Sequence, residues 1–133
     1  ITVDTTLNPN DPTVIGLQGH LPMPVSVTEF AKQVEQALNR QPMVVDSGKP
    51  VHKIGWCTGG GQGFIDQAAA MGVALFLTGE ASEQTFHSAV ENGISFIAAG
   101  HHATERYGVK ALGEHLAKLH GVEHEFINID NPF

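Results

Sequence analysis

Short runs of apolar residues occur along this chain. They alternate with longer stretches in which apolar residues recur at helical spacing among polar ones. The runs at residues 73–77 and 94–99 have the length of buried strands. From residue 53 onward, strands are expected at residues 53–57, 73–77, 94–99 and 125–129, with helices between them at residues 63–71, 82–92 and 103–120. Gly72, Gly93 and Gly121 each follow one of these helices, as glycine commonly does at a helix C-terminus. This alternation predicts an α/β fold with a mixed, mainly parallel sheet flanked by helices.

The first part of the chain has a less regular pattern. Residues 1–25 hold four of the seven prolines, so we expect a mainly irregular segment with a short strand at residues 14–17 and a turn at residues 19–22. A capping box, Ser26 to Glu29, predicts the start of a helix that ends near residue 40. The apolar runs at residues 43–45 and 52–56 are separated by turn-forming residues, which predicts a β-hairpin. Residues 26–133 are then expected to form one α/β lobe.

The last predicted helix carries an apolar stripe at helical spacing. The stripe consists of Val109, Leu112, Leu116 and Leu119. Gly113 within this helix costs about 1 kcal/mol relative to alanine, which indicates either close packing at that position or a tolerated flaw.

Length, charge and cysteine usage narrow the class of protein. The 133 residues, 41% of them hydrophobic, suit one globular domain. A formal net charge of -7 without a cluster of Lys or Arg argues against nucleic-acid binding, and the apolar runs are too short to span a membrane. The single Cys57 excludes an internal disulfide, and we expect a cytoplasmic protein. Because the chain begins with Ile1 rather than Met, we expect a processed protein or a fragment.

Three successive junctions between a strand and a helix carry the polar and glycine residues. They lie at residues 57–61, 78–80 and 100–102. If the strands are parallel neighbours, these junctions share the edge of the sheet at which open α/β folds bind ligands. We therefore expect Cys57, Thr78 and Gly100 to lie at the same edge.

The third junction holds the most specific pair. Glu105 follows His101 by four residues, so that an imidazole and a carboxylate at the start of a helix face one crevice and form a plausible half of a metal site. The alternative is that Glu105 completes helix capping at His102, with both histidines serving as polar loop residues.

The second junction offers acid/base groups. Glu80 could act as a general base, with His87 as a proton shuttle or an orienting partner. Alternatively, Glu80 favours the helix N-terminus and His87 is a surface histidine. The remaining histidines form no cluster with metal-ligand spacing, and we interpret them as surface or packing residues.

The first junction is rich in glycine. Gly59, Gly60 and Gly61 could offer backbone N–H groups to a phosphate or carboxylate, or they form only a tight turn. Phe64 replaces the third glycine of a dinucleotide-binding fingerprint. Cys57 could be a nucleophile at a helix N-terminus, or a small buried residue that ends a strand.

The ordered series of motifs at residues 54–61, 64–68, 78–83 and 100–106 resembles the C-terminal half of the NGG-interacting-factor-three-like family. Members of this family are often called GTP cyclohydrolase I type 2 homologues. The resemblance runs from about residue 16 to residue 132. It implies one lobe of a two-lobed α/β protein that assembles as a hexameric ring, with two divalent metal ions per subunit.

In this family, a histidine and a following glutamate from the C-terminal half complete a metal centre whose other ligands come from the N-terminal half. The resemblance assigns these two roles to His101 and Glu105. Imidazole and carboxylate ligands suit zinc, iron, manganese or nickel. His102 matches a variable position, and His20 stands where the family has an acidic residue. This chain lacks the half that would bring the remaining ligands.

Two functions follow as expectations. One is the C-terminal part of a dinuclear-metal-dependent hydrolase acting on a nucleotide, in which Glu80 and His87 assist and residues 59–61 face the substrate. The other is a non-enzymatic metal-binding ring scaffold or a regulatory interaction protein. We expect the isolated chain to self-associate, to bind metal poorly and to be inactive.

Overall fold

A single mixed sheet organises the computed structural model, which describes residues 1–132 and leaves Phe133, the last residue of the predicted lobe, outside the description. The strands are β1 (Thr2–Thr6), β2 (Leu17–Val25), β3 (Met43–Val45), β4 (Val51–Trp56), β5 (Leu75–Thr78) and β6 (Ser95–Ala98). The helices are α1 (Val27–Leu38), the short 3-10 helix η1 (Gln62–Phe64), α2 (Ile65–Ala70), α3 (Glu83–Asn92) and α4 (His101–His120). The strand order is β1-β2-β4-β5-β6-β3, with β4, β5 and β6 parallel. The predicted α/β class is confirmed.

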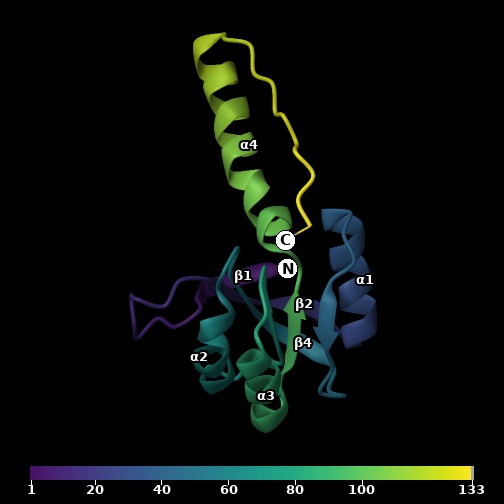
Figure 1. Cartoon of the computed structure of the whole chain (residues 1–133). Helices are drawn as coiled ribbons and strands as arrows, with labels where there is room; N and C mark the ends of the chain where they lie inside the picture. The colour runs from purple at the N-terminus through teal and green to yellow at the C-terminus, as the bar shows by residue number, and fades with distance from the viewer. Residues whose placement is uncertain (133) are drawn as a thin grey trace.

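Helices cover both faces of the sheet, because the central strands are apolar on both sides. Phe76 and Phe96 point to the face that packs against α2 and α3. Their neighbours Leu75 and Ile97 point to the opposite face, where they meet Phe30 of α1. The parallel strands are therefore buried on both faces, as the continuous apolar runs predicted. Figure 1 shows α1 on one side of the sheet and α2 and α3 on the other.

The N-terminal segment is more regular than its prolines predicted. It forms two antiparallel strands, β1 and β2, and residues 19–22, expected as a turn, lie inside β2. Gly19 shows why a turn residue occurs within a strand. A Cβ atom at this position would lie 2.2 Å from the carbonyl oxygen of Thr2, so the close approach of β1 requires glycine.

The predicted hairpin between residues 43–45 and 52–56 is wrong. β3 pairs antiparallel with β6, whereas β4 lies between β2 and β5. The connecting loop is held at β6, because the backbone N–H of Ser47 donates to the hydroxyl of Ser95 at 3.1 Å. A turn-forming composition predicts a change of direction, but it does not determine which strand the chain pairs with next.

Helix α4 projects away from the body of the molecule, and the C-terminal tail returns beside it (Figure 1). The predicted strand at residues 125–129 is wrong, because the tail there is extended chain without sheet pairing. The apolar stripe of α4 is exposed, with Val109 at 64% and Leu112 at 58% of full exposure. Gly113 faces the tail, and a Cβ atom there would lie 2.1 Å from Nε2 of His124, so close packing explains this glycine.

None of the helices in residues 1–132 combines the length and the apolar character needed to cross a membrane.

Candidate metal centre

The three predicted junctions meet at one edge of the sheet, as expected. The N–H of Cys57 donates to the carbonyl of Leu77 at the end of β5, at 3.0 Å. The N–H of Gly79 donates to the carbonyl of Gly59, and that of Gly100 donates to the carbonyl of Gly79, both at 2.9 Å. These backbone hydrogen bonds hold the loops after β4, β5 and β6 together, so their side chains share one crevice.

Two threonine hydroxyls fix the shape of the glycine loop. The hydroxyl of Thr78 accepts from the N–H of Gly61 and donates to the carbonyl of Gly59, each at 3.0 Å. The hydroxyl of Thr104 accepts from the N–H of Gly59 at 2.9 Å. The N–H groups of Gly59 and Gly61 are therefore already bonded, which supports the tight-turn interpretation. A substrate-binding role for Gly59, Gly60 and Gly61 stays a prediction.

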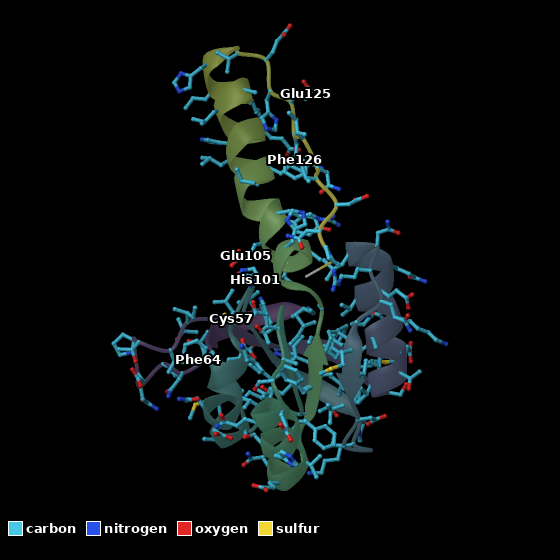
Figure 2. The ribbon with its side chains drawn as sticks, in the orientation of Figure 1. Cys57, Phe64, His101, Glu105, Glu125 and Phe126 are labelled. Carbon is cyan, nitrogen blue, oxygen red and sulfur yellow. The ribbon has the colours of Figure 1, made fainter. Side chains whose placement is uncertain are left out.

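His101 begins α4 and lies between two carboxylates. Its Nδ1 is 2.5 Å from Oε1 of Glu80, in the loop after β5, and its Nε2 is 3.1 Å from Oε2 of Glu105, one helical turn further on. Gln62 donates to the other oxygen of Glu80 at 3.2 Å. Figure 2 shows His101 and Glu105 at the base of α4, above the sheet edge where Cys57 lies. The shared crevice predicted from the spacing of four residues is thus present.

The capping alternative for Glu105 is wrong. Helix α4 has Gly100 as its N-cap and begins at His101, so Glu105 lies beyond the first turn, and its carboxylate contacts the imidazole. The N-cap of α4 has no side-chain hydrogen bond.

The two carboxylates favour the protonated imidazole. The hydrogen bond to Glu80 raises the pKa of His101 above its ordinary value, and Glu105 adds to the rise although desolvation opposes it. The same contact, together with Gln62, lowers the pKa of Glu80. The contribution of His101 to the stability of the fold is complete below about pH 6.5, and it is lost as the pH rises through the raised pKa of His101. The contribution of Glu80 is lost in the opposite direction, as the pH falls through the lowered pKa of Glu80. The pair therefore stabilises the fold most in weakly acidic solution.

The donor chemistry fits two ligands of a divalent metal ion. A carboxylate on one ring nitrogen orients an imidazole so that the other nitrogen can bind a metal, and here Glu80 holds Nδ1 while Nε2 faces Glu105. Among the described residues, no group of three or more His, Cys, Asp or Glu side chains is arranged to hold a metal ion. Any ion bound by His101 and Glu105 would therefore need further donors from outside these residues.

Two other candidate residues lie apart from this pair. Cys57 is 5% exposed, and burial, followed by the charge of Glu105, raises the pKa of its thiol. This favours the small buried residue over the nucleophile. His87 is exposed on α3 with its ring against Phe86, and within residues 1–132 no hydrogen bond or ion pair joins it to His101. An acid/base role for His87 stays a prediction.

Sequence reasoning gave no role to the side chains that support the site. Thr78 and Thr104 build the glycine loop, and Gln62 holds Glu80. Their positions in the sequence could have indicated such a role, because each of these residues lies in or beside one of the three junctions. Arg40, whose side chain packs against Gly100 at the start of α4, was also given no role, because it precedes His101 by about sixty residues and carries no motif.

Comparison with known proteins places the chain in a family. Residues 4–132 match the model of the family described as Duf34/NIF3 (NGG1p interacting factor 3), so the chain belongs to this family. It is 58% identical over 130 residues to a Pseudomonas aeruginosa protein named GTP cyclohydrolase 1 type 2 homolog. The aligned residues make up 98% of this chain and 52% of that protein. An Escherichia coli protein of the same name is 52% identical over 116 residues, or 86% of this chain and 47% of that protein.

Solved structures agree with the fold. The structure of protein ybgI, described as of unknown function, superposes with a TM-score of 0.91 at 48% identity, over 100% of this chain and 53% of that one. TTHA1606 from Thermus thermophilus superposes with a TM-score of 0.80 at 31% sequence identity. The match covers 95% of this chain and 50% of TTHA1606. The chain thus spans about half the length of the relatives that it matches, and the resemblance to the family stated from the sequence is confirmed.

Proposed function

We propose that this chain is the C-terminal part of a metal-dependent, hydrolase-like protein that acts on a nucleotide in the cytoplasm. The observation that carries the proposal is the position of His101, whose Nδ1 is held by Glu80 while its Nε2 faces Glu105 at the ligand-binding edge of an α/β sheet. In the proposal, His101 and Glu105 are two ligands of a centre of two divalent ions of zinc, iron, manganese or nickel.

The remaining residues would assist this centre. Two bound metal ions would supply an activated water molecule and a polarised substrate oxygen or ring carbon. Glu80 would keep the proton on Nδ1 of His101, so that Nε2 stays free for the metal, and Gln62 would hold Glu80 in place. The name GTP cyclohydrolase 1 type 2 homolog, carried by the relatives, supports a nucleotide as the substrate class.

Hydrolysis of nucleotides tests this function. We use a chimaera that joins this chain to the N-terminal half of the Pseudomonas aeruginosa relative, because the chain alone spans 52% of that protein. Loaded with each of the four metals in turn, the chimaera should hydrolyse at least one purine nucleotide, whereas the chain alone should not. Glu105→Gln should abolish the activity, and Glu114→Gln, an exposed carboxylate on α4, should leave it unchanged. Equal activity of the Glu105→Gln and parent chimaeras would contradict the proposal.

The exposed face of α4 supports a second candidate, a ring scaffold built by self-association. Leu112, Leu116 and Leu119 are 58%, 41% and 64% exposed on one side of the helix. Two apolar residues of the adjacent tail, Ile127 and Ile129, are 74% and 72% exposed. Contiguous exposed apolar surface is typical of an interface, and we therefore propose that this chain forms a homo-oligomer.

Light scattering tests the self-association. At tens of micromolar, about the range in which weak interfaces form, we expect a mass above that of the 14.2 kDa monomer. Leu112→Glu should lower the mass to that of the monomer, because it places a charge in the apolar face. Lys118→Gln changes the net charge equally and should have no effect. A monomeric parent chain would count against the candidate.

A further inference from the structure

Both arginines in the sequence lie beside the candidate metal centre. Arg40 follows α1 and packs against Gly100, where a Cβ atom would lie 2.5 Å from Nε of the arginine. Arg106 directly follows Glu105, and its guanidinium donates to the carbonyl of Leu38 at the end of α1, at 2.8 Å. Two positive groups thus converge where α1 ends and α4 begins.

The cavities around these arginines include the proposed metal ligands. One cavity of about 390 Å³ is lined by Arg40, Arg106 and His102. A second, of about 520 Å³, brings Arg40 together with Glu80 and His101. A third, of about 590 Å³, is lined by Arg106 together with His101 and Glu105. The crevice therefore has an acidic side and a basic side within the reach of one small molecule.

Within residues 1–132, the two guanidinium groups donate hydrogen bonds to neutral acceptors. Arg40 donates to the carbonyls of Pro132 at 2.6 Å and Asn131 at 3.4 Å, and Arg106 donates to Oδ1 of Asn128 at 3.4 Å. Within residues 1–132, neither arginine forms an ion pair with a carboxylate. A protein charge usually has a counter-charge when it is partly buried, and residues 1–132 supply none to either arginine.

His102 adds a third group to the same cavity. Its Nε2 is shielded from solvent and finds no hydrogen-bond partner among the described residues. A buried polar atom without a partner indicates a missing ligand or water molecule. The His102 residue also lines the cavity that both arginines line, so an anion placed there would lie beside all three side chains.

We propose that Arg40 and Arg106, with His102, form an anion subsite that takes the phosphate groups of the substrate. Two guanidinium forks match the oxygens of a phosphate chain, and they bind it more strongly than they bind the neutral carbonyls of the tail. Binding of the anion would displace residues 128–132 from the arginines. The identification of the ligand as part of a substrate rests on the proposed function, whereas the subsite itself stands on the two arginines.

Titration of this chain with inorganic pyrophosphate tests the subsite. The readout is the pair of arginine Nε–Hε signals in the NMR spectrum, one for each of Arg40 and Arg106, in a buffer with a metal chelator. We expect saturable shifts of both signals. Arg40→Gln should weaken binding by about tenfold or more, and Arg40→Lys should fall between this variant and the parent, because it keeps the charge but loses the fork. Guanosine, which has no phosphate, should shift neither signal.

Lys118→Gln serves as the matched control, since it removes one positive charge from the far end of α4. It should bind pyrophosphate as the parent does. The absence of saturable shifts in the parent, or equal weakening in the Lys118→Gln and Arg40→Gln variants, would overturn the subsite. Metal binding is measured separately. A parent that binds pyrophosphate while the chimaera binds no metal would contradict the proposed function and leave the anion subsite in place.

Discussion

Replacing His101 by alanine is expected to remove most of the bound metal from the full-length chimaera. The substitution deletes one proposed ligand and leaves Glu105 without its imidazole partner, 3.1 Å away in the parent. Loss of an orienting partner costs metal sites about tenfold to a hundredfold in affinity, and loss of a ligand should cost at least about a hundredfold. Metal content is measured by elemental analysis after identical dialysis of each protein.

His115→Ala is the matched control, because His115 is an exposed histidine on the same helix. It should leave the metal content unchanged. The dialysis is carried out at pH 8, since the carboxylates raise the pKa of His101 and a metal ion must displace a proton from the ring. Unchanged occupancy in the His101→Ala chimaera would remove His101 from the ligand set, and full occupancy in the isolated chain would show that this lobe completes the site alone.

Gly59→Ala is expected to destabilise the chain and to disturb the candidate metal centre together. Gly59 has a φ of +63°, where alanine costs about 1–2 kcal/mol of unfolding free energy. A Cβ atom there would also lie 2.1 Å from Oε1 of Glu105 and 3.1 Å from Nε2 of His101. The carboxylate must therefore move. Urea unfolding of the chain measures the stability, and elemental analysis of the chimaera measures the metal.

Gly48→Ala separates these two effects. Gly48 has a φ of +75°, and a Cβ atom there would meet no atom within 4 Å. The Gly48→Ala variant should lose the same amount of unfolding free energy, about 1–2 kcal/mol, and should keep the metal content of the parent. The additional loss in Gly59→Ala is the consequence of contact with Glu105. Equal stability and equal metal content in the two variants would show that the loop adapts without disturbing the site.

The sequence predicted the features that depend on neighbours along the chain. Ser26 caps α1, with its hydroxyl accepting from the N–H of Glu29 at 3.1 Å, as the capping box indicated. The apolar runs became the parallel strands β4, β5 and β6, and the glycines after α3 and α4 adopt the left-handed conformation expected of helix ends. The spacing of four residues brought His101 and Glu105 into contact.

Contacts between distant segments could not be predicted in this way. The side chain that holds Nδ1 of His101 belongs to Glu80, twenty-one residues earlier, and the cation beside Gly100 comes from Arg40, sixty residues earlier. No local pattern marks such partners. They follow from the strand order, which brings the ends of β5, β6 and α1 together.

The sequence by itself determined the type of each central strand and helix, the N-cap of α1, the glycines that end α3 and α4, and the contact between His101 and Glu105. These depend on torsion preferences and on residues within one helical turn. Only the tertiary structure decided that β3 pairs with β6, that β2 is a strand rather than a turn, and that the tail beside α4 forms no strand. The physical reason is that strand pairing is a competition for sheet edges, and its outcome depends on which backbone groups and apolar faces the rest of the fold leaves free.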